Sequence, residues 1–161
     1  MRKVIFLDID GVLNSELNEK HNNSLGRWSS RDILMYEESM MSLYEIISAT
    51  NAEIILSSTW RFPDEDGSFA TKENLLHQLS EYNMSISDET PQLAVYDRAL
   101  EILTYLENHP EVTHYVVIDD DINLLNNEIL KSHLLYTFSC IGLIEQDIYK
   151  AITILERPID S

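Results

Sequence analysis

The sequence predicts an α/β fold in which helices cover both faces of a mostly parallel sheet. Short apolar segments alternate along the chain with longer segments of helical periodicity, a pattern typical of strands buried on both faces. The chain has 161 residues, of which 44% are hydrophobic, enough for the core of one domain. We therefore expect a single three-layer, Rossmann-like domain over residues 1–161, with the first strand at the centre of the sheet.

The first half of the chain predicts two strands separated by a loop and a helix. Val4–Leu7 is apolar, too short for a helix and followed by acidic residues, which indicates a buried strand. Residues 14–30 are polar and predict a loop. Apolar residues recur at helical spacing over 32–49, and a second apolar strand at 53–56 is followed by hydroxyl residues.

The second half continues the alternation of strand and helix. Pro110 stops a helix over 97–108, and the β-branched segment 114–118 is a strand that runs into three consecutive aspartates. The other expected elements are a loop at 62–68, a helix at 72–82, an irregular segment at 85–95, a short helix at 124–130, a strand at 134–138 and a helix at 145–155.

Charge and composition exclude several classes of protein. Twenty-eight Asp and Glu against 11 Lys and Arg give a net charge of −17, and the basic residues are scattered, so binding of nucleic acid or anionic membrane over a large face is disfavoured. The single Cys140 lies in an apolar stretch and is expected to be a small buried residue. The N-terminal apolar run is too short for a signal peptide, and no apolar stretch is long enough to span a membrane, so we expect a cytoplasmic protein.

Polar side chains follow three of the predicted strands. Asp8 and Asp10 follow the first, Ser57 and Ser58 the second, and Asp119 with its two neighbours the strand at 114–118. The carboxyl ends of parallel strands meet at one edge of a sheet, so these groups should share a crevice. Carboxylates that close together repel one another unless a cation lies between them, and Mg²⁺ is the natural occupant. Solvated strand ends are the alternative for any single cluster.

These segments resemble the motifs of the haloacid dehalogenase (HAD) superfamily. The run from Val4 to Asn14 contains an apolar strand followed by Asp-Ile-Asp-Gly, which is similar to the first motif. The strand ending in Ser57-Ser58-Thr59 resembles the second motif, and Val116–Asp120 resembles the fourth. The strings Ser-Thr-Trp-Arg at 58–61 and Tyr-Val-Val-Ile-Asp-Asp-Asp at 115–121 are closest to a small branch described as similar to domains of RNA-repair proteins.

The resemblance implies a Mg²⁺-dependent phosphatase. By analogy, Asp8 is the nucleophile that forms an aspartyl-phosphate, and Asp10 is the general acid and base. Gly11 permits the close turn that aims both carboxyl groups at one phosphate. The implied metal ligands are Asp8, the backbone carbonyl of Asp10 and a carboxylate of the last motif, with Asp120 favoured over Asp119.

The remaining candidates leave alternatives open. Either Ser57 or Ser58 is expected to donate a hydrogen bond to a phosphoryl oxygen, and the sequence does not separate them. The cation of the third motif is best matched by Arg98, with Lys72 as a weaker candidate; an exposed salt bridge is the alternative for Arg98. Arg61 is a candidate for contact with an anionic substrate.

The sequence predicts the type of reaction better than the substrate. The segment 14–30 is too short for a folded cap, so we expect an open site that admits small or large substrates. Small phosphate esters, including nucleotides, rank first, and a polynucleotide end phosphate ranks second because the net charge disfavours it. A non-catalytic binding module that keeps the fold is the alternative from a different class.

Overall fold

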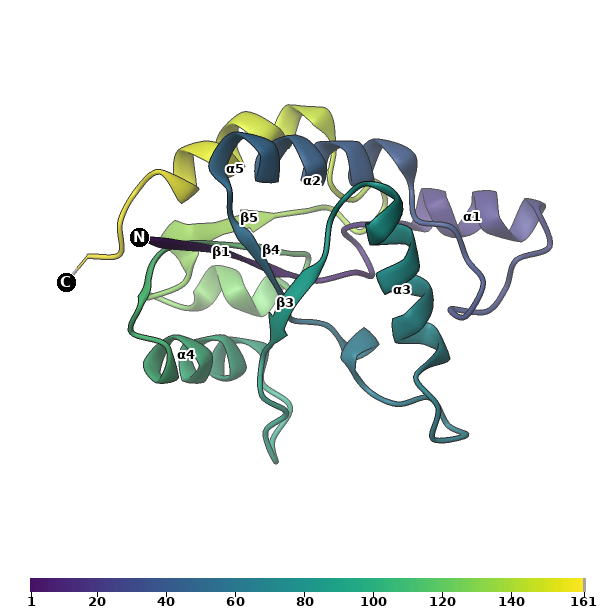
Figure 1. The fold of residues 1–161 in the computed structure, drawn as a ribbon, viewed down its shortest axis with the longest axis horizontal. Coiled ribbons are helices and arrows are strands. Elements are labelled where there is room, and N and C mark those ends of the chain that lie inside the picture. Colours follow the sequence, from purple (N-terminus) through teal and green to yellow (C-terminus); the bar gives the residue numbers. More distant parts are fainter. Residues whose placement is uncertain (161) are drawn as a thin grey trace.

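The computed structural model describes residues 1–160, which form an α/β fold around an all-parallel five-stranded sheet (Figure 1). The strand order is β3-β2-β1-β4-β5, so the first strand is central, as predicted. At the carboxyl end of β1, Leu7 is paired with Leu56 on one side and Ile118 on the other. The strands are β1 (Arg2–Leu7), β2 (Glu53–Leu56), β3 (Ile86–Glu89), β4 (Val112–Asp119) and β5 (Leu134–Tyr136).

Helices cover both faces of this sheet, which confirms the predicted three layers. Figure 1 shows α2 and α5 together on one face and α4 on the other. The helices are α1 (Glu16–Ser24), α2 (Glu37–Thr50), α3 (Ala70–Glu81), α4 (Arg98–Asn108) and α5 (Ile148–Leu155). Four short 3₁₀ helices are η1 (Thr59–Arg61), η2 (Ile122–Asn126), η3 (Lys131–His133) and η4 (Glu145–Asp147).

The alternation of side chains along β1 divides the core in two. Ile5 and Leu7 face the layer that contains α2, α3 and α5, whereas Val4 and Phe6 face α4. All four are fully buried, as expected for a central parallel strand with no solvated face. The same alternation continues past the strand, so it brings the residue after Leu7 to the face covered by α4.

The prediction of a continuous loop over 14–30 is wrong, because residues 16–24 form α1. Ser15 caps this helix by accepting a hydrogen bond from the Asn18 backbone N–H at 3.1 Å. Its inward face is polar: Asn18 and Asn22 are buried, and the Asn22 side chain exchanges hydrogen bonds of 2.7 and 2.9 Å with the backbone of Leu34. Buried amides replace the apolar stripe from which a helix is predicted.

Three further expectations need correction. The segment 85–95 contains the edge strand β3, whose sequence Ile-Ser-Asp-Glu is polar because only one of its edges is paired. The expected helix at 124–130 is instead the 3₁₀ helix η2, and α2 begins at Glu37, five residues later than expected. Cys140 is exposed, because it lies in a loop that packs on the segment after β1 through its backbone.

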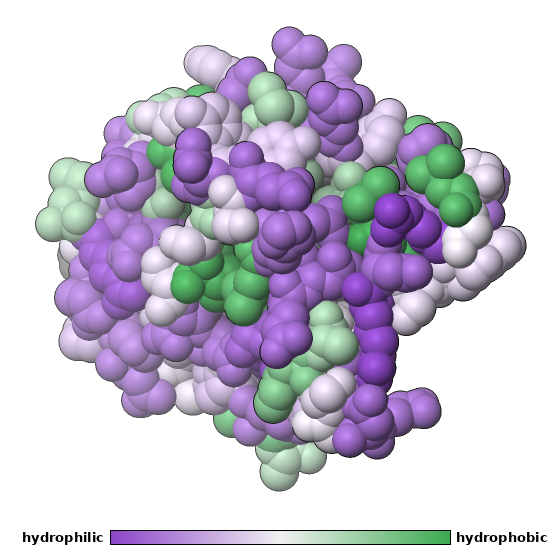
Figure 2. Space-filling model, turned by 45° about the vertical axis from the view of Figure 1, so that its right-hand side comes forward, coloured by the Kyte–Doolittle hydropathy of each residue, from purple (hydrophilic) through white to green (hydrophobic). Residues whose placement is uncertain are grey.

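The structure has no sizeable cap over the carboxyl edge of the sheet. In Figure 1 the short α1 lies to the right, beyond the carboxyl end of β1. The view in Figure 2 brings this side forward, and its surface is mainly hydrophilic with small, separate hydrophobic patches. Within residues 1–160, no helix combines the length and apolar character needed to cross a bilayer.

Candidate active site

Backbone hydrogen bonds hold three strand ends side by side at the carboxyl edge of the sheet. The Asp8 N–H donates to the Ile118 carbonyl at 3.1 Å, and the Ser57 N–H donates to the Leu7 carbonyl at 2.9 Å. Ser57, Asp8 and Asp119 therefore lie side by side at the carboxyl ends of β2, β1 and β4. The structure thus brings together groups that are separated by about 50 or more residues in the chain.

Arg98 joins these strand ends from the first turn of α4. Its Nη1 lies 2.8 Å from the Asp119 Oδ2 and 3.3 Å from the Asp8 Oδ1, and it also donates to the Ser57 carbonyl. Its Nη2 donates to the Tyr96 hydroxyl at 3.0 Å. Asp97 caps α4 by accepting from the Leu100 N–H, which places Arg98 at the start of the helix. Arg98 is 6% exposed and lies inside the cluster, so it is not a surface salt bridge.

Burial perturbs the ionisation of both paired carboxyl groups. Burial, with the nearby Asp119 carboxylate, raises the pKa of Asp8 well above its usual value, although Arg98 opposes this shift. Burial also raises the pKa of Asp119 to about 6, against the same guanidinium. One guanidinium therefore does not compensate the carboxylates, and a further cation would favour their ionised forms.

Three carboxylates converge closely enough to share a metal ion. Asp8, Asp119 and Asp120 each place one carboxylate oxygen within 4.8 Å of the others. Together with Arg98, they carry two net negative charges when ionised. The Asp119 oxygens already accept from Arg98 and from the Asp121 N–H at 2.9 Å, whereas Asp120 is partly exposed. Hard carboxylate oxygens in this arrangement fit Mg²⁺.

The turn after β1 depends on Gly11, which has a φ of +82°. A Cβ at this position would lie 2.0 Å from the Asp120 Oδ2, so the glycine gives space to a carboxylate of the cluster as well as permitting the backbone conformation. Thr137, just after β5, donates from its hydroxyl to the Gly11 carbonyl at 2.9 Å. The turn after β1 is therefore held against the segments that follow β4 and β5.

Asp10 lies at the exposed rim of the cluster, and its carboxylate is held by two neutral donors. The Trp60 indole N–H donates to Oδ2 at 3.1 Å, and the Asn14 amide donates to Oδ1 at 3.0 Å. Asn14 is fixed in turn by Asn18 of α1 at 2.9 Å. Sequence reasoning missed both partners, and the only signal for Asn14 is its position four residues after Asp10.

The two candidate serines have different environments. Both are buried, but the Ser58 hydroxyl accepts from the Trp60 N–H at 3.2 Å and caps η1. The Ser57 hydroxyl has no hydrogen-bond partner among the described residues. A buried hydroxyl without a partner is costly and uncommon, which makes Ser57 the one with unused hydrogen-bonding capacity.

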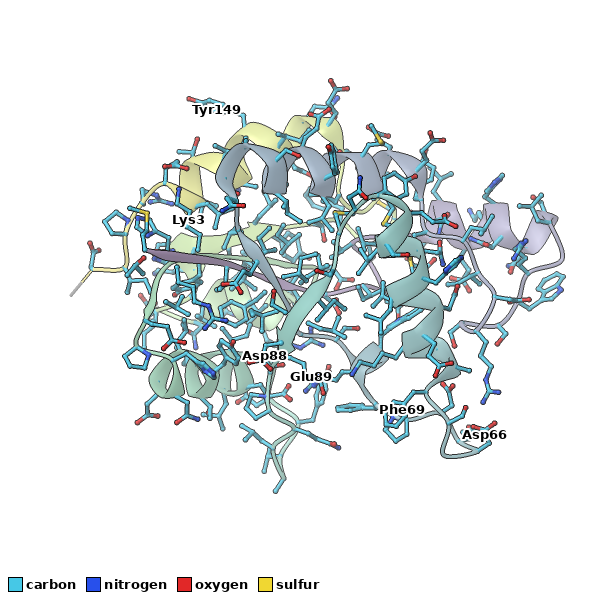
Figure 3. The ribbon with its side chains drawn as sticks, in the orientation of Figure 1. Lys3, Asp66, Phe69, Asp88, Glu89 and Tyr149 are labelled. Atoms are coloured by element: carbon cyan, nitrogen blue, oxygen red, sulfur yellow. The ribbon has the colours of Figure 1, made fainter. Side chains whose placement is uncertain are left out.

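The structure does not bring Arg61 or Lys72 to the carboxylate cluster. The Arg61 side chain is 2% exposed and pairs with the equally buried Glu101 of α4, and Arg61 does not line the hollow that contains Asp8. The Lys72 Nζ lies 2.8 Å from Glu89 and 5.9 Å from the centre of the Phe69 ring. Figure 3 labels Phe69 near the start of α3 and Glu89 at the end of β3, the edge strand of the sheet. Arg98 is therefore the cation next to Asp8.

The cluster opens into a hollow of about 410 Å³. Its lining includes the carboxylates of Asp8, Asp10, Asp119 and Asp120, along with Arg98. Tyr96 and Thr59 form part of the remaining wall. The hollow is large enough for a small ligand and places a cation and several carboxylates around it.

Comparison with known proteins identifies the fold family. A family model described as the HAD domain in Swiss Army Knife RNA repair proteins matches residues 4–148. The chain belongs to this family. No curated protein matches the chain. Membership in a HAD family agrees with the resemblance of the three strand ends to the HAD motifs.

Proposed function

We propose that this protein is a Mg²⁺-dependent phosphomonoesterase that acts through an aspartyl-phosphate on Asp8. The observation that carries the proposal is the position of Arg98, which contacts both Asp8 and Asp119 at the base of the hollow. A fixed guanidinium beside a carboxylate is suited to bind a phosphoryl group against that carboxylate. Asp10 at the rim supplies the acid that an oxygen leaving group requires.

The proposed reaction has two steps. In the first, an Asp8 carboxylate oxygen attacks phosphorus, the bond from phosphorus to the ester oxygen breaks, and that oxygen leaves as an alcohol with the proton from Asp10. In the second, Asp10 takes a proton from water as the water oxygen attacks phosphorus. The bond from phosphorus to Asp8 then breaks, which releases inorganic phosphate and restores both carboxyl groups.

The Asp8, Asp119 and Asp120 carboxylates would hold Mg²⁺, together with the backbone carbonyl of Asp10. The unused oxygens of Asp120 favour it over Asp119 as the direct ligand from the last motif. A bound Mg²⁺ would neutralise the carboxylates and the phosphoryl charge. The raised pKa of Asp8 supports this assignment, because an ionised nucleophile needs such compensation.

We assign the phosphoryl hydrogen bond of the second motif to Ser57. Its free hydroxyl supports this choice, since Ser58 caps η1. Ser57→Ala should therefore lower kcat/KM without a large loss of stability. Ser58→Ala should instead lower the melting temperature, because removing an N-cap costs about 0.5–2 kcal/mol. The reverse pattern would assign the contact to Ser58.

Substrate assignment follows from the open site and the charge. A small phosphate ester or nucleotide fits a 410 Å³ hollow in a protein with a net charge of −17. A polynucleotide end phosphate is the second candidate, favoured by the name of the matching family and by the lack of a sizeable cap. Turnover of a mononucleotide and of a phosphorylated oligonucleotide, compared at several salt concentrations, separates the two.

The test of the function is Mg²⁺-dependent release of phosphate from a panel of phosphomonoesters. Asp8→Asn should abolish turnover and leave the fold intact. Asp10→Asn should lower the rate about 10²–10⁴-fold, most strongly for poor leaving groups. Asp160→Asn is the matched control, because Asp160 is an exposed aspartate that does not line the hollow. Failure on the whole panel would overturn the proposal.

The competing class is a non-catalytic binding module with the same fold. Retention of Asp8, Asp10, Asp119 and Asp120 argues against it, because grouped carboxylates cost stability without a cation. Thermal melting distinguishes the classes cheaply, since Mg²⁺ bound to the native site should raise the melting temperature with concentration. No shift at millimolar Mg²⁺, with or without a phosphate analogue, would favour the binding module.

A further inference from the structure

A second hollow of about 300 Å³ adjoins the carboxylate cluster on the side of α1. Its lining includes Trp60, Arg27 and Trp28, and Asp10 is the residue that it shares with the catalytic hollow. We call it the α1 hollow. Its volume lies at the lower end of the range for small-molecule sites, which is room for one nucleoside-sized group.

The position of Asp10 indicates which part of a substrate the α1 hollow would receive. This step rests on the proposed function, in which Asp10 protonates the leaving oxygen. A proton donor must be within hydrogen-bond reach of that oxygen, so the group attached to the oxygen extends from Asp10. A third hollow, of about 380 Å³, shares Arg98 and Tyr96 with the catalytic hollow but not Asp10. The α1 hollow is thus the one next to the proton donor.

Trp28 gives this hollow an exposed aromatic surface. Its side chain is 73% exposed, an unusual state for the largest apolar residue, and it follows α1 in a short polar segment. Trp60, by contrast, is buried and committed to Asp10 through its indole N–H. An exposed indole at the wall of a hollow can stack on a planar ring, and base stacking on an aromatic side chain strengthens binding by roughly tenfold or more.

Arg27 adds a positive charge that no acid neutralises. Its Nη1 donates to the Asp32 carbonyl at 2.6 Å, which fixes the guanidinium, but Arg27 has no salt-bridge partner within residues 1–160. Lys20, Lys150 and Arg157 also make no salt bridge within residues 1–160, but of these four cations only Arg27 lines the hollow next to Asp10. Glu19 is the acid of the lining besides Asp10, and it opposes anions on the α1 side. A phosphate group bound in the α1 hollow should therefore lie on the side of Arg27, away from Glu19.

We propose that the α1 hollow binds the nucleoside part of a nucleotide that carries a second phosphate. The base stacks on Trp28, Arg27 pairs with the second phosphate, and the phosphate to be removed lies over Asp8. A free nucleoside bisphosphate and the phosphorylated end of an oligonucleotide share this chemistry. The phosphate on Arg27 is a monoester in the first ligand and a phosphodiester in the second.

Binding without turnover tests the assignment independently of catalysis. The two tryptophans of the chain report through their fluorescence, and Asp8→Asn prevents hydrolysis. The probes are adenosine 3′,5′-bisphosphate, a short oligonucleotide with a terminal 3′-phosphate, and ribose 5-phosphate, which lacks a base. The nucleotide probes should quench the fluorescence, and Trp28→Phe in this background should remove most of the quenching. The ribose phosphate should not quench it.

Two variants test the individual contacts in the same background. Trp28→Ala should raise the Kd of the bisphosphate about tenfold, and Arg27→Gln should weaken the bisphosphate more than adenosine 3′-monophosphate. Tyr149→Ala and Arg157→Gln are matched controls, because Tyr149 is 81% exposed on α5, as labelled in Figure 3, and Arg157 also lacks a salt-bridge partner within the described residues. Neither should change the Kd. Equal effects in the controls would overturn the proposal.

Kinetics separate this inference from the proposed function. Trp28→Ala should lower the ratio of kcat/KM for the nucleotide to that for glycerol phosphate about tenfold. Turnover of glycerol phosphate as efficient as that of the nucleotide would refute the α1 hollow and leave the phosphatase intact. Binding that depends on Trp28, without turnover of any substrate, would support the α1 hollow and refute the phosphatase. A preference for the oligonucleotide over the bisphosphate identifies a strand end as the source of the ligand.

Discussion

Removal of the Arg61 side chain should destabilise the protein strongly, because it leaves Glu101 buried without its partner. Arg61 is the last residue of η1, three residues after Ser58, and Glu101 lies one turn after Arg98 in α4. Both side chains are 2% exposed. Burial raises the pKa of Glu101 and lowers that of Arg61, and in each case the charge of the partner opposes the shift.

The magnitude follows from this burial. Breaking a buried ion pair by removing one partner costs about 3–5 kcal/mol, and the low exposure gives no reason to reduce that figure. Arg61 also donates a hydrogen bond to the Ser58 carbonyl at 2.8 Å, and the substitution removes this donor as well. For a chain of this length, the corresponding fall in melting temperature is about 10 °C.

A double-mutant cycle in urea measures the effect. Arg61→Met and Glu101→Leu should each lower the free energy of unfolding, and the double variant should lose less than the sum because neither charge remains buried. Lys150→Met, an exposed cation of α5, is the control and should change stability by under about 0.5 kcal/mol. Stability retained in Arg61→Met together with a raised KM would refute the reasoning and restore Arg61 as a substrate contact.

Three further predictions concern the carboxylate cluster. Burial raises the pKa of Asp119 to about 6 and that of Asp8 well above its usual value. The stability that these groups contribute when protonated is therefore present below about pH 4 and is lost as the pH rises through their raised pKa values, which for Asp119 is about 6. Mg²⁺ should therefore raise the melting temperature more at pH 7.5 than at pH 5, and an equal rise at the two pH values would contradict this. Gly11→Ala should abolish that Mg²⁺-dependent shift, because its Cβ would lie 2.0 Å from a carboxylate oxygen; a retained shift in differential scanning fluorimetry would show that the turn can relax. Trp60→Phe keeps the ring but removes the hydrogen bond to Asp10, so kcat should fall about tenfold for alkyl phosphates and less for p-nitrophenyl phosphate; equal losses would assign Trp60 to packing alone.

Local sequence patterns predicted the strands that carry the site. Val4–Leu7 and 53–56 are apolar because both faces of a central parallel strand are buried. Such an apolar run can be recognised in the sequence without knowledge of its neighbours in the fold. The chemistry-bearing residues follow directly in sequence, so the edge on which they meet could be inferred from parallel pairing alone. The central place of β1 in the sheet is confirmed on the same grounds.

Polar elements were the ones that sequence patterns missed. The inner face of α1 is made of buried asparagines, and β3 is an edge strand with a polar sequence. Both depend on hydrogen bonds to distant backbone, such as that from Asn22 to Leu34, rather than on burial of apolar area. A hydrophobic period carries no information about such elements.

The sequence by itself determined which polar residues follow each strand. It therefore determined the set of groups available for catalysis. Only the tertiary structure decided between residues of the same type: Arg98 contacts Asp8, whereas Arg61 pairs with Glu101 and Lys72 with Glu89. The physical reason is that an arginine or lysine is suited to any nearby carboxylate. Which carboxylate it meets depends on how helices pack against the sheet, and that geometry is not encoded in the spacing of charges along the chain.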